Sequence, residues 1–567
     1  MAALPQTQHA LQLTGPDSLV LNTSKKVFTP SQHQILCRVE AVGLCFSDLK
    51  LLRQFSSHPR KGPITSGIDL QALGEFPGYV PGEAPTVPGH ETALTIEALG
   101  PGVEGFETNQ RSILQADYRW LLTAGSNAAF GYNFEGALQE YVLLDERVIT
   151  NPQGRSMLIP VSHELSASAA ALVEPWACVE DAYAANQRQK INPDSRMLIV
   201  AEAPVAENAL TEFLDLYGKP AQLTWLSKFP APDLNVALTE AKNLSQLDDA
   251  SYDDCIYFGS SAKTVEGLFS KLAPHGLFNI VLCGGRFGQG VITPVGRLHY
   301  AGFRIIGTSG TDPAESMQYI PQTGEVRPAD RINVVGAAGP IGTMHVIRNM
   351  GHHVGYPTVV CRNIEGVSVF AADVDENRLS ALSKIAEPLA EKNHVRYKAF
   401  NPLKEKPPIN FDYIVLMVPN PELITASIKN AAPGAIINVF AGIPESVAAK
   451  LDLDSYISKK LYFIATSGSV LEDMQQVLAK VESGTLDTNV SVAAVCGLDG
   501  AADGIRAIEN RSIAGKIIVY PACKGLALTT LQELAEKLPH VADCLNHGLW
   551  TKEAELKLLQ IYGCTAE

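Results

Sequence analysis

The chain has 567 residues, 46% of them hydrophobic and 19% charged, with 45 glycines and 35 prolines, which excludes fibrous and disordered classes and predicts three or four globular domains. Its 60 acidic and 45 basic residues give a formal charge of -15, which disfavours nucleic acid or an anionic membrane surface as the main partner. We therefore expect a small-molecule partner, no nucleic acid and no membrane.

The sequence also bears on compartment and assembly. No apolar run reaches the roughly 18 residues that span a bilayer, and residues 1–6 lack the charged and apolar regions of a signal peptide. The ten cysteines include no Cys-x-x-Cys pair, which suits reduced thiols better than a disulfide framework. We expect a cytoplasmic protein that forms a homo-oligomer.

The first part of the chain reads as short β segments, such as Gln34–Val42 and Gln139–Leu144, separated by turns rich in glycine and proline. Three patches within it, Gly43–Asp48, Pro88–Glu91 and Val173–Pro175, supply a thiolate, an imidazole and carboxylates. Three ligands of mixed S, N and O character that leave one position open form the ligand set of a catalytic zinc site. Each patch alone is also explained without a metal, as a buried apolar cysteine or a surface His-Glu pair. The three together favour a metal site.

From Arg196 onward, apolar strands alternate with helix-length segments, which predicts a parallel sheet with covering helices. Residues 273–284 resemble residues 432–442 with a one-residue gap, and from the closing glycine each is followed at the same offset by Thr-Ser-Gly. Buried strands that follow turns often look alike, but the paired spacing favours a duplication. We expect two tandem α/β units of nucleotide-binding type.

The second unit carries a glycine-rich turn after the strand Arg331–Val335. The turn contains Gly336, Gly339, Pro340, Ile341 and Gly342 and leads into a helix. Glycines let the backbone approach a pyrophosphate, and the helix N-terminus attracts its negative charge. The spacing is G-x-x-G-x-x-G rather than the commoner G-x-G-x-x-G, so the surrounding pattern carries the prediction.

A second strand, residues 366–372, ends at Asp373, whose carboxylate can accept hydrogen bonds from ribose hydroxyls and repel a 2′-phosphate. This favours NAD over NADP. The separation between Gly336 and Asp373 exceeds the usual twenty or so residues, because residues 351–357 look inserted. The alternative is a packing turn followed by a surface aspartate.

The first unit has the matching strand, Arg196–Val200, but the residues that follow it, 201–207, contain two carboxylates and no glycine. Carboxylates would repel a pyrophosphate. We interpret this unit as a degenerate copy that provides spacing, a dimer contact or a wall of the substrate cleft.

These residues together resemble the zinc-containing medium-chain dehydrogenase/reductase superfamily. The resemblance is carried by Gly43–Asp48, Gly89–Glu91, Glu174–Pro175 and Ser512–Val519, and it covers residues from about 30 to 190 and from about 330 to 520. Glu174–Pro175, where the simple alcohol dehydrogenases carry a cysteine ligand, resembles the polyol and sugar dehydrogenase branch.

The resemblance implies an α/β fold class. It implies a GroES-like, mostly-β catalytic domain over residues 1–190, a degenerate Rossmann-type unit over 191–328, an NAD-binding Rossmann unit over 329–470, and a return to the catalytic domain with C-terminal helices over 471–567.

The resemblance also implies roles for the site residues. Cys45 and His90 would bind the zinc, and either Glu91 or Glu174 would supply the carboxylate. Ser47 would take the proton from the substrate alcohol, Asp48 would orient the imidazole, and Lys50 stands where some relatives have a proton-relay histidine. Pro175 is expected to push Glu174 out of helical conformation. The superfamily's structural zinc lobe uses four closely spaced cysteines, and since none lies between Cys45 and Cys178, we expect one catalytic zinc.

The implied activity is the reversible oxidation, with NAD, of a secondary alcohol of a sugar, polyol or derivative. The segments Gln115–Trp120 and Gly131–Gly136 mix aromatic and polar groups that suit a sugar ring, although ordinary loops do so too. Two alternatives remain open, an NADPH-dependent reductase of a keto sugar or its phosphate, and a non-catalytic nucleotide-binding scaffold or sensor.

Overall fold

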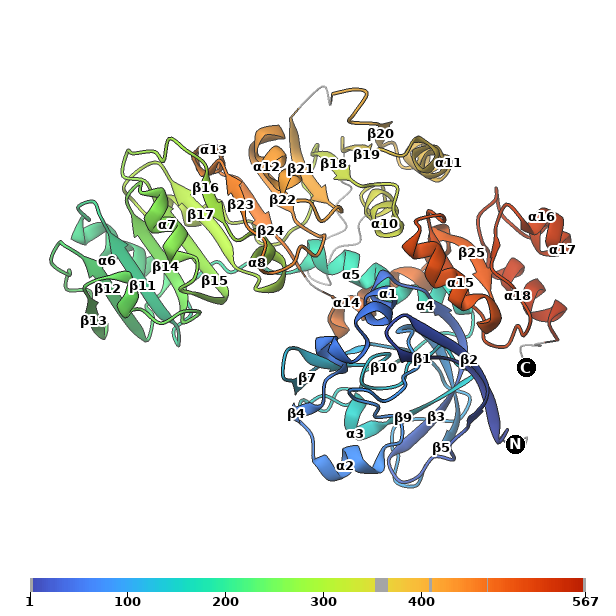
Figure 1. Cartoon of the computed structure of the whole chain (residues 1–567). Coiled ribbons are helices and arrows are strands. Elements are labelled where there is room, and N and C mark those ends of the chain that lie inside the picture. The colour runs from blue at the N-terminus through green and yellow to red at the C-terminus, as the bar shows by residue number, and fades with distance from the viewer. Residues whose placement is uncertain (1–3, 352–365, 407–409, 467, 564–567) are drawn as a thin grey trace. The chain divides into compact units, whose positions relative to one another are not determined.

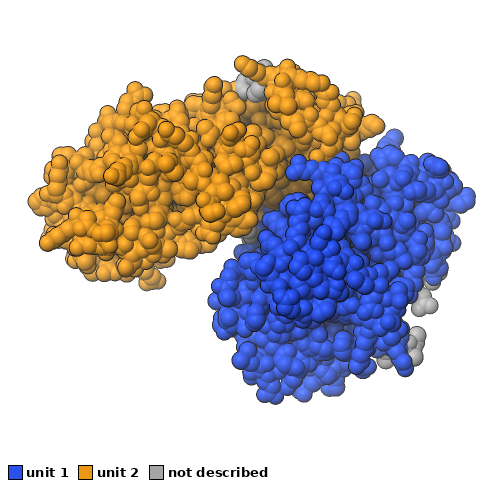
Figure 2. Space-filling model, in the orientation of Figure 1, with its two compact units in different colours: residues 1–180, 468–567 blue, residues 181–467 orange. Residues whose placement is uncertain are grey.

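The structure is a computed structural model that describes residues 4–351, 366–406, 410–466 and 468–563. The chain forms two compact units, coloured in Figure 2. The first unit combines residues 1–180 with residues 468–567, and the second comprises residues 181–467. The first unit is therefore discontinuous in sequence, with the second inserted into it.

The first unit is built on an eight-stranded sheet of order β10-β6-β5-β3-β26-β25-β27, with β9 also paired to β3 (Figure 1). Its strands are β3 (Gln34–Gly43), β5 (Glu91–Leu99), β6 (Arg111–Leu114), β9 (Tyr141–Asp145), β10 (Leu158–Pro160), β25 (Val492–Cys496), β26 (Lys516–Val519) and β27 (Thr529–Thr530). Two smaller sheets are formed by β1 (Thr7–Gly15) with β2 (Ser18–Lys26), and by β4 (Ile64–Ser66), β7 (Asp117–Thr123) and β8 (Asn127–Ala129). The predicted strands at Gln34–Val42 and Gln139–Leu144 correspond to β3 and β9.

Short helices surround these sheets. They are α1 (Phe46–Gln54), α2 (Leu70–Glu75), α3 (Glu146–Ile149), α4 (Ala167–Ala171), α5 (Val173–Ala184), α14 (Leu471–Glu482), α15 (Leu498–Glu509), α16 (Leu534–Lys537), α17 (Pro539–Ala542) and α18 (Lys552–Ile561), with 3₁₀ turns at Phe55–Ser57, Pro59–Lys61 and Thr488–Ser491. The C-terminal helix is fixed by Glu555, whose buried carboxylate accepts the N–H groups of Ala167 and Ser168 at 2.6 and 2.8 Å. This contact satisfies two free N–H groups at the start of α4.

The second unit contains two six-stranded parallel sheets of the same order. The first comprises β13 (Leu238–Ala241), β12 (Gln222–Ser227), β11 (Arg196–Ala201), β14 (Tyr252–Phe258), β15 (Leu272–Val281) and β17 (Arg304–Thr308). The second comprises β20 (Arg396–Phe400), β19 (Ser368–Ala372), β18 (Arg331–Val335), β21 (Phe411–Leu416), β22 (Ala431–Asn438) and β24 (Tyr462–Ile464). In each, the chain starts at a central strand, fills one side and then the other, which is the doubly wound Rossmann order. The predicted fold class is therefore confirmed.

The helices of the second unit are distributed over both copies. They are α6 (Glu207–Tyr217), α7 (Ala262–Leu268), α8 (Val295–Tyr300) and α9 (Ala314–Met317) with the 3₁₀ turn Leu244–Gln246 in the first copy, and α10 (Pro340–Arg348), α11 (Glu376–Lys392), α12 (Pro421–Asn430) and α13 (Leu453–Ser458) in the second. A further two-stranded ladder joins the copies, formed by β16 (Val291–Thr293) and β23 (Ala449–Leu451). Among all the helices described, none combines the length and the apolar character needed to cross a bilayer.

Candidate functional site

Antiparallel pairing in the first unit brings the first two sequence patches together. Strand β3 ends where β5 begins, and the register places Gly43 opposite Glu91. Cys45 follows the end of β3, and His90 immediately precedes β5. Two patches that are well separated in sequence therefore meet where β3 ends and β5 begins.

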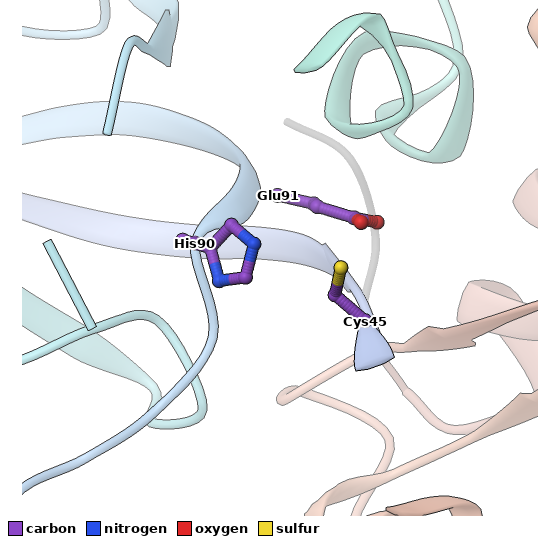
Figure 3. Close-up of side chains that lie close together, drawn as sticks. All are labelled: Cys45, His90 and Glu91. Atoms are coloured by element: carbon purple, nitrogen blue, oxygen red, sulfur yellow. The ribbon is translucent and has the colours of Figure 1, made fainter. Parts of the chain in front are cut away.

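The donor atoms of Cys45, His90 and Glu91 all lie within 4.8 Å of one another, and Figure 3 shows the three side chains converging. Glu91 is fully buried and His90 is 8% exposed, whereas Cys45 is half-buried. Within the described part of the chain, the buried Oε2 of Glu91 has no hydrogen-bond partner. A thiol, an imidazole and a carboxylate oxygen with an unused lone pair form a donor set that fits Zn²⁺.

Gly43 is required by this arrangement. A Cβ atom at this position would stand 2.2 Å from Oε2 of Glu91. Any side chain would therefore displace the carboxylate from its place beside Cys45 and His90.

Asp48 holds both ligand-bearing segments. Its carboxylate accepts the backbone N–H of Cys45 at 2.9 Å and that of Gly89 at 3.2 Å, and its Oδ1 lies 3.5 Å from Nδ1 of His90. On the other side of the imidazole, Nε2 lies 3.1 Å from the hydroxyl oxygen of Ser47. The ring is thus placed with Nδ1 toward Asp48 and Nε2 toward Ser47.

The surroundings of His90 also favour a charged imidazole. Burial alone would lower the pKa of His90, but hydrogen bonding and charge from Asp48 and Cys45 outweigh it and raise the pKa well above its ordinary value. The negative groups that produce this effect are the ones that would attract a cation to the same position.

Lys516 is a member of the site that the sequence reasoning missed. Its ammonium is buried, forms an ion pair with Oε1 of Glu91 and donates to the carbonyl of Leu44 at 3.3 Å. Burial would lower the pKa of Lys516, but Glu91 and Cys45 raise it above its ordinary value. A lysine that opens an otherwise apolar strand, Lys516–Val519, was the available signal, since a lysine is almost never fully buried unless it is paired.

Glu174 lies near this cluster but outside the group of three atoms. Its Oε1 accepts a hydrogen bond from the thiol of Cys178 at 3.5 Å. Burial raises the pKa of the Glu174 carboxyl above its usual range, Glu91 raises it further, and His90 and Lys516 oppose that rise. The expectation that Pro175 forces Glu174 out of helical conformation is wrong, because both residues lie in the first turn of α5. Proline is tolerated there, where its missing N–H would have no helical partner.

A polar and aromatic wall adjoins the cluster. The ring of Tyr132 lies 6.1 Å from that of His90 and 4.9 Å from that of His58, centroid to centroid, and the guanidinium of Arg60 lies 5.7 Å from the Tyr132 centroid. Arg60 forms a two-pronged ion pair with Asp117, and the side chains retain 26% and 11% exposure. Tyr132 and Asp117 come from the segments predicted to suit a sugar ring, whereas Arg60 was missed.

Lys50, predicted to stand at a proton-relay position, is exposed. Its ammonium lies 5.8 Å from the ring centroid of Phe46.

The glycine-rich turn of the second unit connects β18 to α10. Gly336 has φ of +82°, a conformation that side chains disfavour. A Cβ on Gly342 would stand 2.3 Å from the carbonyl oxygen of Gly336, so the helix can approach the turn only with glycine at that position. Pro340 occupies the first helical position and Ile341 the next, and the first turn of α10 has no side-chain cap. Its N–H groups are therefore available to an anion.

Asp373 follows β19 beside this turn. Its Oδ2 accepts the N–H of Ala338 at 3.1 Å and its Oδ1 that of Asp375 at 3.2 Å. Arg378 of α11 is a second neighbour that the sequence reasoning did not name, with Nη2 3.6 Å from the point where a Cβ on Gly339 would stand. Residues 352–365, which include most of the segment predicted to be inserted, lie outside the described residues.

In the first copy of the second unit, a side chain of the corresponding turn, that of Glu202, takes part in hydrogen bonds of its own. Glu202 follows β11, and its carboxylate accepts hydrogen bonds from the hydroxyls of Tyr257 and Thr264, both at 2.6 Å. Tyr257 lies on β14, the strand beside β11 where the strand order reverses. A nucleotide would bind in that crevice in a sheet of this order, so a carboxylate there supports the interpretation of a degenerate copy.

Comparisons with known proteins agree with this picture. The family model for the alcohol dehydrogenase GroES-like domain matches residues 31–153, and the model for zinc-binding dehydrogenases matches residues 392–519. L-sorbose 1-phosphate reductase of Klebsiella pneumoniae is 30% identical over 151 residues, which are 26% of this chain and 36% of the relative. Sorbitol dehydrogenase of Halalkalibacterium halodurans is 24% identical over 220 residues, which are 36% of this chain and 51% of the relative.

The chain thus spans about a third and about half of the lengths of these two curated relatives. Among solved structures, 2R,3R-butanediol dehydrogenase from Bacillus subtilis aligns with 91% of this chain and 100% of its own, with a TM-score of 0.50 and 14% identity. At this identity the likeness concerns the fold.

Proposed function

The chain belongs to the zinc-containing medium-chain dehydrogenase/reductase superfamily, and on that premise we propose that it is an NAD-dependent zinc oxidoreductase. Its substrate is the secondary alcohol of a sugar, a polyol or a derivative, which it oxidises reversibly. The observation that carries the proposal is the convergence of the Cys45, His90 and Glu91 donor atoms at one buried sheet edge.

Zinc fits this donor set, and it would be held by Cys45, His90 and a carboxylate. When bound, it would act as a Lewis acid toward the substrate oxygen. Glu91 and Glu174 both remain candidates for the carboxylate. Glu91 lies closer to the other two donors but forms an ion pair with Lys516. Glu174 is one helical turn from Cys178, and no residue that the structure describes forms an ion pair with it.

The protein's own groups prepare the proton transfer. The Ser47 hydroxyl lies 3.1 Å from His90 Nε2, beside the position that the metal would take. There it can accept a hydrogen bond from the substrate alcohol and relay the alcohol's proton to bulk water, while hydride passes from the carbon to the nicotinamide. Asp48 fixes the backbone on both sides of the imidazole, so the distance between Ser47 and His90 is held before substrate arrives.

Polar substrates are supported by the wall beside the cluster. The Arg60–Asp117 pair presents donors and acceptors with little net charge, which suits several hydroxyl groups, and the Tyr132 ring offers an apolar face. The names of two relatives, a sorbitol dehydrogenase and an L-sorbose 1-phosphate reductase, point to the same substrate class.

The nucleotide would be bound by the second unit. Gly336, Gly339, Pro340, Ile341 and Gly342 would receive the pyrophosphate at the start of α10, and Asp373 would accept the ribose hydroxyls. A specific observation keeps a second candidate, an NADPH-dependent reductase of a keto sugar, because the Arg378 guanidinium beside Gly339 could pair with a 2′-phosphate.

Elemental analysis of the purified chain, combined with a screen of polyols and sugars, tests the proposal. We expect about one zinc per chain, lost in Cys45→Ala and retained in the control Cys283→Ala, whose cysteine lies in the second unit. Ser47→Ala should retain zinc and lose activity by about 100-fold or more. A metal-free parent, or full activity in Cys45→Ala, would refute it.

A further inference from the structure

The two copies in the second unit are joined through equivalent elements. Strands β16 and β23 occupy the same position in their copies, each following the fifth strand of its sheet and preceding the short helix α8 or α13. They pair with each other in antiparallel register, with Val291 opposite Leu451 and Ile292 opposite Lys450 (Figure 1). Equivalent strands of the two copies therefore pair in antiparallel directions, as strands related by a two-fold axis do.

Contacts on either side of this ladder are reciprocal. The N–H of Gly296, the second residue of α8, donates to the carbonyl of Val447 at 3.0 Å, in the loop that precedes β23. Asp454, the second residue of α13, accepts the N–H groups of Phe287 and Gly288, both at 2.9 Å, in the loop that precedes β16. The same position of each copy thus contacts the same loop of the other.

The last strands of the two sheets also meet. The hydroxyl of Tyr456 donates to the carbonyl of Ile305 in β17 at 2.8 Å and accepts the N–H of Phe463 in β24 at 3.0 Å. Val295 and Leu298 of α8 are fully buried in one apolar core with Tyr456 and Phe463. Each sheet therefore uses the other to cover an apolar edge that would otherwise be open to unwanted pairing.

An interface in which equivalent surfaces contact each other is the isologous type, formed by two copies of one chain in a symmetric dimer. We infer that the degenerate first copy is a fused internal partner: it occupies, within one chain, the surface that a second copy would use. In place of the homo-oligomer expected from the sequence, the chain is a monomer with a single functional nucleotide turn. This inference does not depend on the metal or on the reaction.

Sedimentation velocity of the full chain at micromolar concentrations tests the inference. We expect the mass of one chain, unchanged by concentration. A dimer that strengthens with concentration would overturn it.

A cross-link identifies the pairing itself. Ile292 and Lys450 are exposed and directly opposite each other, so their Cβ atoms are about 5 Å apart. In a variant that combines Ile292→Cys with Lys450→Cys, a short bifunctional thiol-reactive cross-linker should join two peptides of the same chain. The product should run as a single chain on a denaturing gel, and a digest should contain the linked peptide. The control Ile292→Cys alone should give no such peptide. An interchain product, or no linked peptide in the folded double variant, would refute the internal partner, whatever the zinc and nucleotide assays show.

Discussion

The two nucleotide-type copies of the second unit share their strand order but differ at the turn after the first strand. In the second copy, glycines let the turn of residues 336–342 pass close to α10, whose first turn has no side-chain cap. In the first copy, the residue after the first strand is Glu202, whose exposed carboxylate is hydrogen-bonded to Tyr257 and Thr264. The two copies thus keep the same strand order while the residues of this turn differ.

The comparison predicts that nucleotide binding depends on the second turn alone. In Gly342→Val, the new Cβ would collide with the Gly336 carbonyl, and NADH binding, measured by fluorescence titration, should weaken by at least about 100-fold. A control change in the first turn, Ala206→Val at the residue before α6, should leave the dissociation constant unchanged. Equal loss in both variants would remove the distinction between the copies.

A buried histidine sets the helix of the second turn apart from its counterpart. His345 of α10 is fully buried, with Nδ1 2.8 Å from the hydroxyl of Tyr183, and burial, assisted by Arg348, lowers its pKa to about 3. In the unfolded chain His345 has the ordinary histidine pKa of about 6.5, so the unfolded chain binds the proton more readily than the folded one. The stability that neutral His345 contributes is therefore fully present above about pH 6.5 and is lost as the pH falls toward 3.

Relative to His345→Gln, the parent should therefore lose roughly 1.4 kcal/mol of unfolding free energy per pH unit between pH 6 and pH 4. Urea unfolding at several pH values measures this difference. Helix α6, the counterpart in the first copy, has no histidine, so this pH dependence is expected of the second copy alone. If the unfolding free energies of parent and variant changed with pH in parallel, His345 would not be its source.

Cofactor choice sharpens the contrast further. Asp373→Ala should shift the ratio of KM values for NAD and NADP about tenfold toward NADP, since it removes the carboxylate that repels a 2′-phosphate. Adding Arg378→Ala should return much of that shift. An unchanged ratio in Asp373→Ala would assign cofactor choice to other residues.

The smallest effect is expected in the first turn. Glu202→Gln should lower the unfolding free energy by about 1 kcal/mol, because two hydroxyls lose a charged acceptor. Its nucleotide affinity should equal that of the parent. The control Glu212→Gln on the exposed side of α6 should change neither quantity, and tighter nucleotide binding in Glu202→Gln would show that the first copy still binds.

Sequence patterns predicted the fold class and the three donor patches because those depend on local features, such as apolar strands, glycine turns and ligand residue types. They did not reveal Lys516, which reaches Glu91 only through the pairing of β26 with β3, or Arg60, which reaches Tyr132 and Asp117 through a turn. They also misjudged Glu174, since the preference of a residue before proline yields to the tolerance of proline in a first helical turn. Residue spacing along the chain does not show which distant strands pair, so contacts that depend on such pairing could not be predicted from it.

The discontinuity of the first unit fixes the order in which the site can form during synthesis. Cys45, His90 and Glu91 leave the ribosome early, but β26, which carries Lys516 and pairs with β3, follows only after the whole of residues 181–467 has been made. Domains generally fold as units, with N-terminal parts first. The second unit can therefore fold before the first unit is complete. Until β26 is made, the carboxylate of Glu91 lacks its ion pair with the Lys516 ammonium. A nascent chain halted before residue 516 should hold a folded second unit and a candidate metal site that lacks Lys516.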